Sequence, residues 1–169
     1  FFSRDFLEAR PLLQAMEQDG GSVLLSARAM GDVLATVVNN DGIVRATRWR
    51  EAGGRIVLDG GDSGVVRVSG SLDAHSADGA GGDISVTGRS IALDTGARLD
   101  ASGAGDGGRI RVGGGWQGQD ASLRNAQQVQ VAADVRLQAD AGQAAGQTGQ
   151  GGEVVVWSDD STRFAGHVS

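Results

Sequence analysis

The stretch GGDISVTGRSIALDTGARLDASG, residues 81–103, decides the fold. It holds three short segments in which apolar and polar residues alternate, and each segment is followed by Gly or Asp. Alternation with a period of two is typical of a β-strand that buries one face, and Gly and Asp favour turns. The stretch therefore predicts three short strands joined by turns, with no helix between them.

A Gly pair opens this stretch, and similar pairs open four other segments of the chain. The pairs begin at Gly20, Gly53, Gly81, Gly107 and Gly151, which gives spacings of 33, 28, 26 and 44 residues. Aliphatic residues fill the same two positions after each pair: Val23 and Leu25, Ile56 and Leu58, Ile84 and Val86, Ile110 and Val112, Val154 and Val156. Self-similarity at this spacing indicates a solenoid, in which each repeat forms one coil.

Two further strands are expected in each repeat. The middle strand carries Thr36 with Val38, Val66 with Val68, Ile91 with Leu93, and Val129 with Val131. The last strand carries Val44 with Ala46, Leu72 with Ala74, Leu99 with Ala101, and Leu137 with Ala139. The sequence thus predicts an all-β fold, a right-handed parallel β-helix of about five coils with three short strands per coil.

Energetics require these coils to stack. One coil buries about six aliphatic side chains, each worth roughly 1.5 to 3 kcal/mol. Ordering its backbone costs about 1 to 2 kcal/mol per residue, so a single coil cannot fold alone. Stacking adds burial and parallel strand pairing with every coil, at roughly 4.8 Å per coil.

The repeat also predicts a column of charged residues on the outside of the stack. The first outward position after each Gly pair is Ser22, Arg55, Asp83, Arg109 and Glu153 in turn. In a parallel stack these residues become neighbours, and the last four alternate in sign. Opposite charges on adjacent strands stabilise by some tenths of a kcal/mol per contact.

An inserted loop is expected at residues 113–128, where GGGWQGQDASLRNAQ separates two strands. Loops that leave a rigid scaffold commonly carry binding residues. We therefore predict ligand or partner contacts at Trp116, Gln117, Gln119 and Arg124. Trp157 follows a buried strand directly, which favours a structural role for its side chain.

Composition excludes several functions. The chain of 169 residues has 29 Gly, no Cys and a net charge of -6, and all its basic residues are Arg. The negative charge argues against nucleic-acid binding, and no apolar run is long enough for membrane insertion. Without Cys there is no disulfide framework and no thiolate metal site.

Residues 1–18 form an atypical N-terminal segment before the repeats of residues 19–169. Apolar positions at Phe2, Phe6, Leu7, Leu13 and Met16 predict a short amphipathic helix that caps the first coil. Charged residues interrupt the apolar pattern, so the segment is not a signal peptide. If the protein is exported, we expect its signal to lie outside this chain.

The candidate catalytic and metal-binding residues favour turns and loops. Asp94 and Asp100 stand at strand ends shortly before a Gly, where Asp forms turns. His75 and His167 lack partners at metal-ligand spacing, and GGDSG and GAGDGG do not match the nine-residue calcium repeat. There is no Cys nucleophile and no Gly-x-Ser-x-Gly motif. We expect no enzymatic activity, no metal and no cofactor.

Several segments together resemble a known family. VVNNDGIVRA, GGRIVLDGGDSGVVRVSGSLDA, TGARLDASGAGDGGRIRVGGGWQGQ and GGEVVVWSDDSTRFAGHVS are similar to the parallel β-helix of filamentous-haemagglutinin-type exoproteins. The resemblance covers roughly residues 19–169. It implies the shaft of a large secreted surface adhesin of a Gram-negative bacterium, exported by an outer-membrane β-barrel transporter in two-partner secretion. Such proteins act in cell adhesion, aggregation, biofilm formation and virulence, through a surface receptor or glycan.

Two alternatives to the adhesin shaft remain open. A carbohydrate-active β-helix enzyme would carry a row of outward Asp, Arg and Lys on one face. A self-assembling structural solenoid would associate end to end through its open strand edges.

Overall fold

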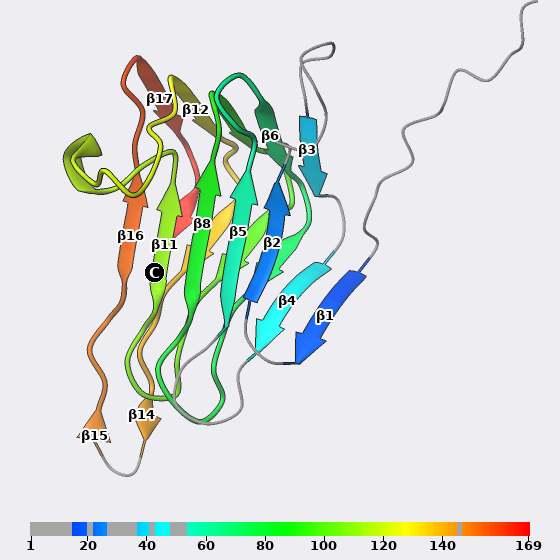
Figure 1. The fold of residues 1–169 in the computed structure, drawn as a ribbon. Coiled ribbons are helices and arrows are strands. Elements are labelled where there is room, and N and C mark those ends of the chain that lie inside the picture. Colours follow the sequence, from blue (N-terminus) through cyan, green and yellow to red (C-terminus); the bar gives the residue numbers. More distant parts are fainter. Residues whose placement is uncertain (1–14, 20–21, 27–36, 41–42, 48–53, 145–146) are drawn as a thin grey trace, which may run out of the picture.

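The computed structural model describes residues 15–19, 22–26, 37–40, 43–47, 54–144 and 147–169. Three parallel sheets make up the fold (Figure 1). Sheet A contains β1 (Ala15–Asp19), β4 (Ile43–Thr47), β7 (Ser71–Asp73), β10 (Arg98–Asp100), β13 (Arg136–Gln138) and β18 (His167–Val168). Sheet B contains β2 (Ser22–Ser26), β5 (Arg55–Asp59), β8 (Asp83–Thr87), β11 (Arg109–Val112) and β16 (Glu153–Val156). Sheet C contains β3 (Val37–Asn40), β6 (Val65–Val68), β9 (Ser90–Leu93), β12 (Gln128–Val131) and β17 (Ser161–Phe164).

Consecutive strands therefore visit the three sheets in rotation. The triplets β2–β4, β5–β7, β8–β10, β11–β13 and β16–β18 each place one strand in each sheet, with β1 preceding them in sheet A. Within the three sheets, neighbouring strands come from successive coils and pair in parallel. This confirms the parallel β-helix with three short strands per coil.

Strand pairing confirms the two columns predicted after the Gly pairs. Val23, Ile56, Ile84, Ile110 and Val154 are register partners from coil to coil. The second column joins Leu25, Leu58, Val86, Val112 and Val156 in the same way. The last-strand column is also confirmed, because Leu72, Leu99 and Leu137 are partners.

One register prediction was wrong by two residues. Val38 pairs with Val66, whereas the sequence alignment had matched Val38 to Val68. Asn40 is the true partner of Val68, and Thr36 lies outside the described residues. A shift by two keeps every side chain on the same face, so alternation alone cannot fix this register.

The N-terminal helix prediction is wrong for the part of that segment which the structure describes. Ala15–Asp19 is the strand β1, and its Met16 pairs with Val44 of β4. Pairing along a neighbouring strand satisfies the backbone of this segment and overrides its weak helical pattern. Residues 1–14 lie outside the described residues, and the solenoid includes residue 15 rather than beginning at 19.

The core is a continuous apolar column between the three sheets. The largest side chains within it are fully buried: Ile56, Leu58, Leu72, Ile84, Leu93, Leu99, Ile110 and Leu137. They come from all three sheets and from every coil between β5 and β13. Each coil thus covers the apolar residues of its neighbours, as stacking requires.

In the later Gly pairs, at least one glycine stands where a side chain cannot fit. A Cβ atom at Gly108 would lie 2.0 Å from the carbonyl oxygen of Gly82 in the preceding coil. Gly152 meets the same obstacle at Gly108, where the distance would be 2.1 Å. The backbones of successive coils approach closely at this corner, which only Gly permits.

Two further elements leave the regular coil. A short antiparallel hairpin joins β14 (Gln143–Ala144) and β15 (Gln147–Thr148), and it projects beyond one end of sheet B in Figure 1. The 3₁₀ turn η2 (Trp116–Gly118) belongs to the loop between β11 and β12. This loop contains the predicted contact residues and is the starting point for a functional site.

Candidate functional site

The loop between β11 and β12 spans residues 113–127, one residue shorter than the predicted 113–128, because Gln128 already belongs to β12. It starts with three consecutive glycines, of which Gly113 has a φ of 79°. A Cβ atom at Gly113 would also lie 2.2 Å from the carbonyl oxygen of Trp157. These glycines let the chain turn sharply out of β11 while it stays in contact with the next coil.

Hydrogen bonds anchor the loop to the following coil. The Asn125 Nδ2 group donates to the Gly118 carbonyl oxygen and to Asp159 Oδ1, each at 3.1 Å. Trp157 Nε1 donates to the same Asp159 oxygen at 3.0 Å. Trp157 is therefore linked to the loop through Asp159, which agrees with the structural role predicted for it.

A second anchor joins the loop to the outer face of sheet B. Arg111 of β11 lies 3.3 Å from Asp120 of the loop and 3.7 Å from Asp83 of β8. Asp120 also accepts hydrogen bonds from the backbone N–H and the hydroxyl of Ser122. These Ser122 bonds, with a smaller contribution from Arg111, lower the pKa of Asp120 below its usual 3.8. The ionised carboxylate thus holds the loop in this conformation.

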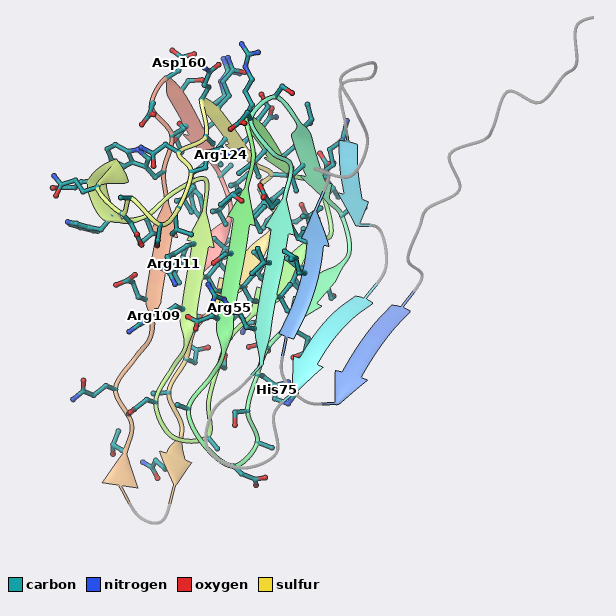
Figure 2. The ribbon with its side chains drawn as sticks, in the orientation of Figure 1. Arg55, His75, Arg109, Arg111, Arg124 and Asp160 are labelled. Atoms are coloured by element: carbon teal, nitrogen blue, oxygen red, sulfur yellow. The ribbon has the colours of Figure 1, made fainter. Side chains whose placement is uncertain are left out.

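The far end of the loop reaches back across two coils. Arg124 Nη1 lies 2.7 Å from Asp62 Oδ1, which stands in the turn after β5. This contact is an ion pair without hydrogen-bond alignment, since Arg124 Nη1 has no hydrogen-bond partner. Figure 2 labels Arg55, Arg109 and Arg111 along sheet B, with Arg124 above them. The loop consequently covers part of the outer face of this sheet.

A groove of about 460 Å³ lies between the loop and sheet B. Its residues are Arg55, Val57 and Asp59 of β5, Ser85 and Thr87 of β8, and Ala121 to Arg124 of the loop. Ser85 is only 1% exposed and Thr87 only 7%, although both occupy outward strand positions. We call this feature the loop groove.

Some polar groups in the loop groove have hydrogen-bond partners, and one does not. Thr87 Oγ1 donates to Asp59 Oδ1 at 3.3 Å, and Asp59 Oδ1 also accepts from the Gly61 N–H at 2.9 Å. The buried Ser85 Oγ has no hydrogen-bond partner. The groove therefore holds one unused hydroxyl beside a carboxylate and two guanidinium groups.

The four predicted contact residues fall into two places. Trp116, Gln117 and Gln119 lie together at the tip of the loop, where Trp116 is 70% exposed and the two Gln amides are 3.3 Å apart. Gln117 has a φ of 53°, which is unusual for a residue other than Gly. Arg124 instead lines the loop groove.

The predicted register of the charged column is confirmed, but its ion pairs are not those expected between direct register partners. Ser22, Arg55, Asp83, Arg109 and Glu153 are successive partners across sheet B. Asp83 nevertheless makes its salt bridge to Arg111, two residues further along the neighbouring strand than its register partner Arg109. Sequence reasoning placed the column correctly, but it missed Ser85, Thr87 and Asp59 as groove residues. The one available signal was the small Ser85 at an outward position, next to the outward Asp83 on the same strand.

Other candidate catalytic and metal-binding residues either accept hydrogen bonds from backbone N–H groups or contact one charged side chain. Asp100 accepts the Ser102 N–H at 2.9 Å, as a turn former does, and Asp94 pairs with Arg67 at 2.8 Å. His75 does have an acidic neighbour, since its Nδ1 lies 2.6 Å from Asp73 Oδ1. Within the described ranges, no group of three or more His, Cys, Asp or Glu residues could hold a metal ion.

Comparison with known proteins adds no relative. Neither a protein-family model nor a curated protein matches the chain. Among the residues that the structure describes, no helix has the length and apolar character needed to cross a membrane.

Proposed function

We propose that this chain is a structural shaft segment of a large secreted bacterial surface adhesin of the filamentous-haemagglutinin type. The observation that carries the proposal is the uninterrupted stacking of equivalent residues, from Val23 through Ile56, Ile84 and Ile110 to Val154. Each further coil lengthens such a stack without changing its cross-section. A stack of this kind holds binding regions away from a cell surface, which is the mechanical task of a shaft.

The location and export route belong to the same proposal. The resemblance implies a Gram-negative cell surface, an outer-membrane β-barrel transporter as export partner, and a role in adhesion, aggregation or biofilm formation. A net charge of -6 is compatible with an extended surface protein that stays soluble.

Surface labelling tests this function. An antibody raised against the purified chain is expected to label intact cells and to detect the protein in culture medium. Cells that lack the cognate outer-membrane transporter should lose both signals and adhere less. Labelling that appears only after cell lysis would contradict the proposal.

One observation favours the carbohydrate-active enzyme. Arg55, Asp83, Arg109 and Glu153 form a row of outward charges on sheet B. A polysaccharide-cleaving site also needs carboxylates that can exchange protons. Asp83 and Asp120 count against the enzyme in this respect, because both are engaged with Arg111. Incubation with pectin and other acidic glycans, followed by measurement of new reducing or unsaturated ends, separates the two functions. If the chain cleaves these glycans and the Asp83→Asn variant does not, the enzyme function is supported and the shaft function is not.

A different observation favours end-to-end self-assembly. In the coil of β16–β18, Phe164 is 43% exposed and Val168 is 53% exposed, although both continue core columns. Exposed apolar columns beside open strand edges favour association. Phe164→Asp is expected to reduce concentration-dependent association in sedimentation velocity experiments, and Trp116→Ala serves as an exposed control outside the columns. Equal association of Phe164→Asp and the parent chain would exclude this route.

A further inference from the structure

The buried hydroxyl in the loop groove is the starting point. Ser85 is 1% exposed, and its Oγ has no hydrogen-bond partner. A buried polar group without a partner lowers stability, so such groups in folded proteins require an explanation. Because Ser85 lines the groove, a molecule in the groove can supply the missing hydrogen bond.

The charges around Ser85 restrict the chemistry of that molecule. Arg55 lines the groove from β5, and it forms no ion pair within the described part of the chain. Arg124 lines it from the loop and is held there by Asp62. The Arg55 guanidinium favours a carboxylate in the ligand, since a carboxylate accepts two parallel hydrogen bonds from Arg.

The remaining groups favour hydroxyls and an apolar face. Asp59 lines the same groove and can accept hydrogen bonds from ligand hydroxyls, but it disfavours a doubly charged anion such as phosphate. Val57 from β5 and Leu123 from the loop contribute apolar surface to the groove. The volume of about 460 Å³ falls within the range of roughly 300 to 1,000 Å³ for small-molecule sites.

We propose that the loop groove binds a carboxylate-bearing sugar, such as a hexuronate unit. Arg55 pairs with the carboxylate, Ser85 Oγ hydrogen-bonds a ring hydroxyl, and Val57 contacts the apolar face of the ring. The site involves no chemical step and does not depend on the shaft function. Trp116 is outside the groove residues, so the site is distinct from the loop tip.

Nuclear magnetic resonance titration of the full chain tests the site. Glucuronate and galacturonate are compared with glucose and galactose, the matched neutral sugars, and with short oligogalacturonides to distinguish a free sugar from a polymer unit. The acidic sugars are expected to shift the amide signals of Ser85, Thr87 and Leu123 in a saturable way. Absence of shifts with every acidic probe, or equal shifts with the neutral sugars, would overturn the proposal.

Three variants assign the effect to named groups. Arg55→Gln is expected to weaken binding roughly tenfold to a hundredfold, as loss of a charged hydrogen bond does. Ser85→Ala is expected to weaken binding about tenfold while leaving the melting temperature of the free chain unchanged or higher, because no internal hydrogen bond is lost. Arg109→Gln is the matched control, since Arg109 occupies the same column outside the groove. Unchanged affinity in Arg55→Gln, or an equal loss in Arg109→Gln, would also overturn the proposal.

Discussion

Single glycines decide how closely successive coils can approach. Gly108 faces the carbonyl oxygen of Gly82, and a Cβ atom there would stand at 2.0 Å from it. Gly151 lies in another of the Gly pairs, yet a Cβ atom there would meet nothing within 4 Å. Glycines of the repeated pairs therefore differ in what they contribute. The sequence predicts that Gly pairs recur, but only the coordinates reveal which member of a pair contacts the neighbouring backbone.

This difference gives a matched pair of variants. Gly108→Ala is expected to lower the free energy of unfolding by about 1 to 3 kcal/mol or more, because the added methyl group forces the coils apart. Gly151→Ala is expected to have no effect or to stabilise by up to about 1 kcal/mol, since the unfolded chain loses freedom. Urea unfolding followed by circular dichroism measures both. Equal losses in the two variants would show that close packing at Gly108 is not the cause.

The strands and the inserted loop differ in how far the sequence predicts them. Alternation predicts β5, β8 and β11 and their register, because each strand has one buried face. The same alternation cannot distinguish a shift by two residues, and for this reason Val38 was matched to the wrong partner. The helix expected at Met16 is instead a strand, since pairing with β4 outweighs a weak local pattern.

The loop was recognised from its length, yet its position over sheet B was not. Its placement depends on long-range contacts such as Arg124 with Asp62 and Asn125 with Asp159. No periodic signal in a sequence marks contacts of this kind. The loop groove therefore could not be predicted, although Arg124 within it was singled out.

The anchoring of the loop is expected to depend on pH through Asp120. Its pKa is lowered in the folded chain, first by the hydrogen bonds from Ser122 and then by Arg111. A lowered pKa means that the contribution is fully present above the ordinary value of 3.8 and is lost as the pH falls through the lowered pKa. The amide signal of Ser122 should thus move toward its unbonded position only below pH 3.8.

Asp120→Asn is the comparison that isolates this effect. The variant should show the low-pH position of the Ser122 signal at neutral pH and little change on acidification. Asp134→Asn, which alters a carboxylate that accepts the Gly96 N–H outside the loop, is the control and should titrate like the parent chain. A Ser122 signal that responds to acid equally in Asp120→Asn would contradict this account.

At the scale of the whole molecule, stability depends on position within the stack. Leu72, Leu99, Leu137 and Val168 occupy one column in sheet A. Leu99 is fully buried between coils on both sides, whereas Val168 in the coil of β16–β18 is 53% exposed. The same column position therefore contributes differently in different coils, as expected for an assembly stabilised by contacts between neighbours.

Two truncations in this column measure the difference. Leu99→Ala is expected to lower the free energy of unfolding by about 2 to 5 kcal/mol, because it leaves a cavity in the middle of the core. Val168→Ala is expected to change it by no more than about 0.5 kcal/mol, since little buried surface is lost. Chemical denaturation of both variants checks the comparison. Similar losses of unfolding free energy in Leu99→Ala and Val168→Ala would contradict the view that residues in the middle of the stack contribute more to stability than those in the coil of β16–β18.

The alternating column of sheet B also bears on how the coils find their proper neighbours during folding. Nearly identical coils invite a folding error in which one coil is skipped and its two neighbours pair directly. Skipping a coil would place Arg55 beside Arg109, or Asp83 beside Glu153, and like charges on adjacent strands repel. The alternation of sign therefore favours pairing with the adjacent coil and disfavours pairing with the coil after it.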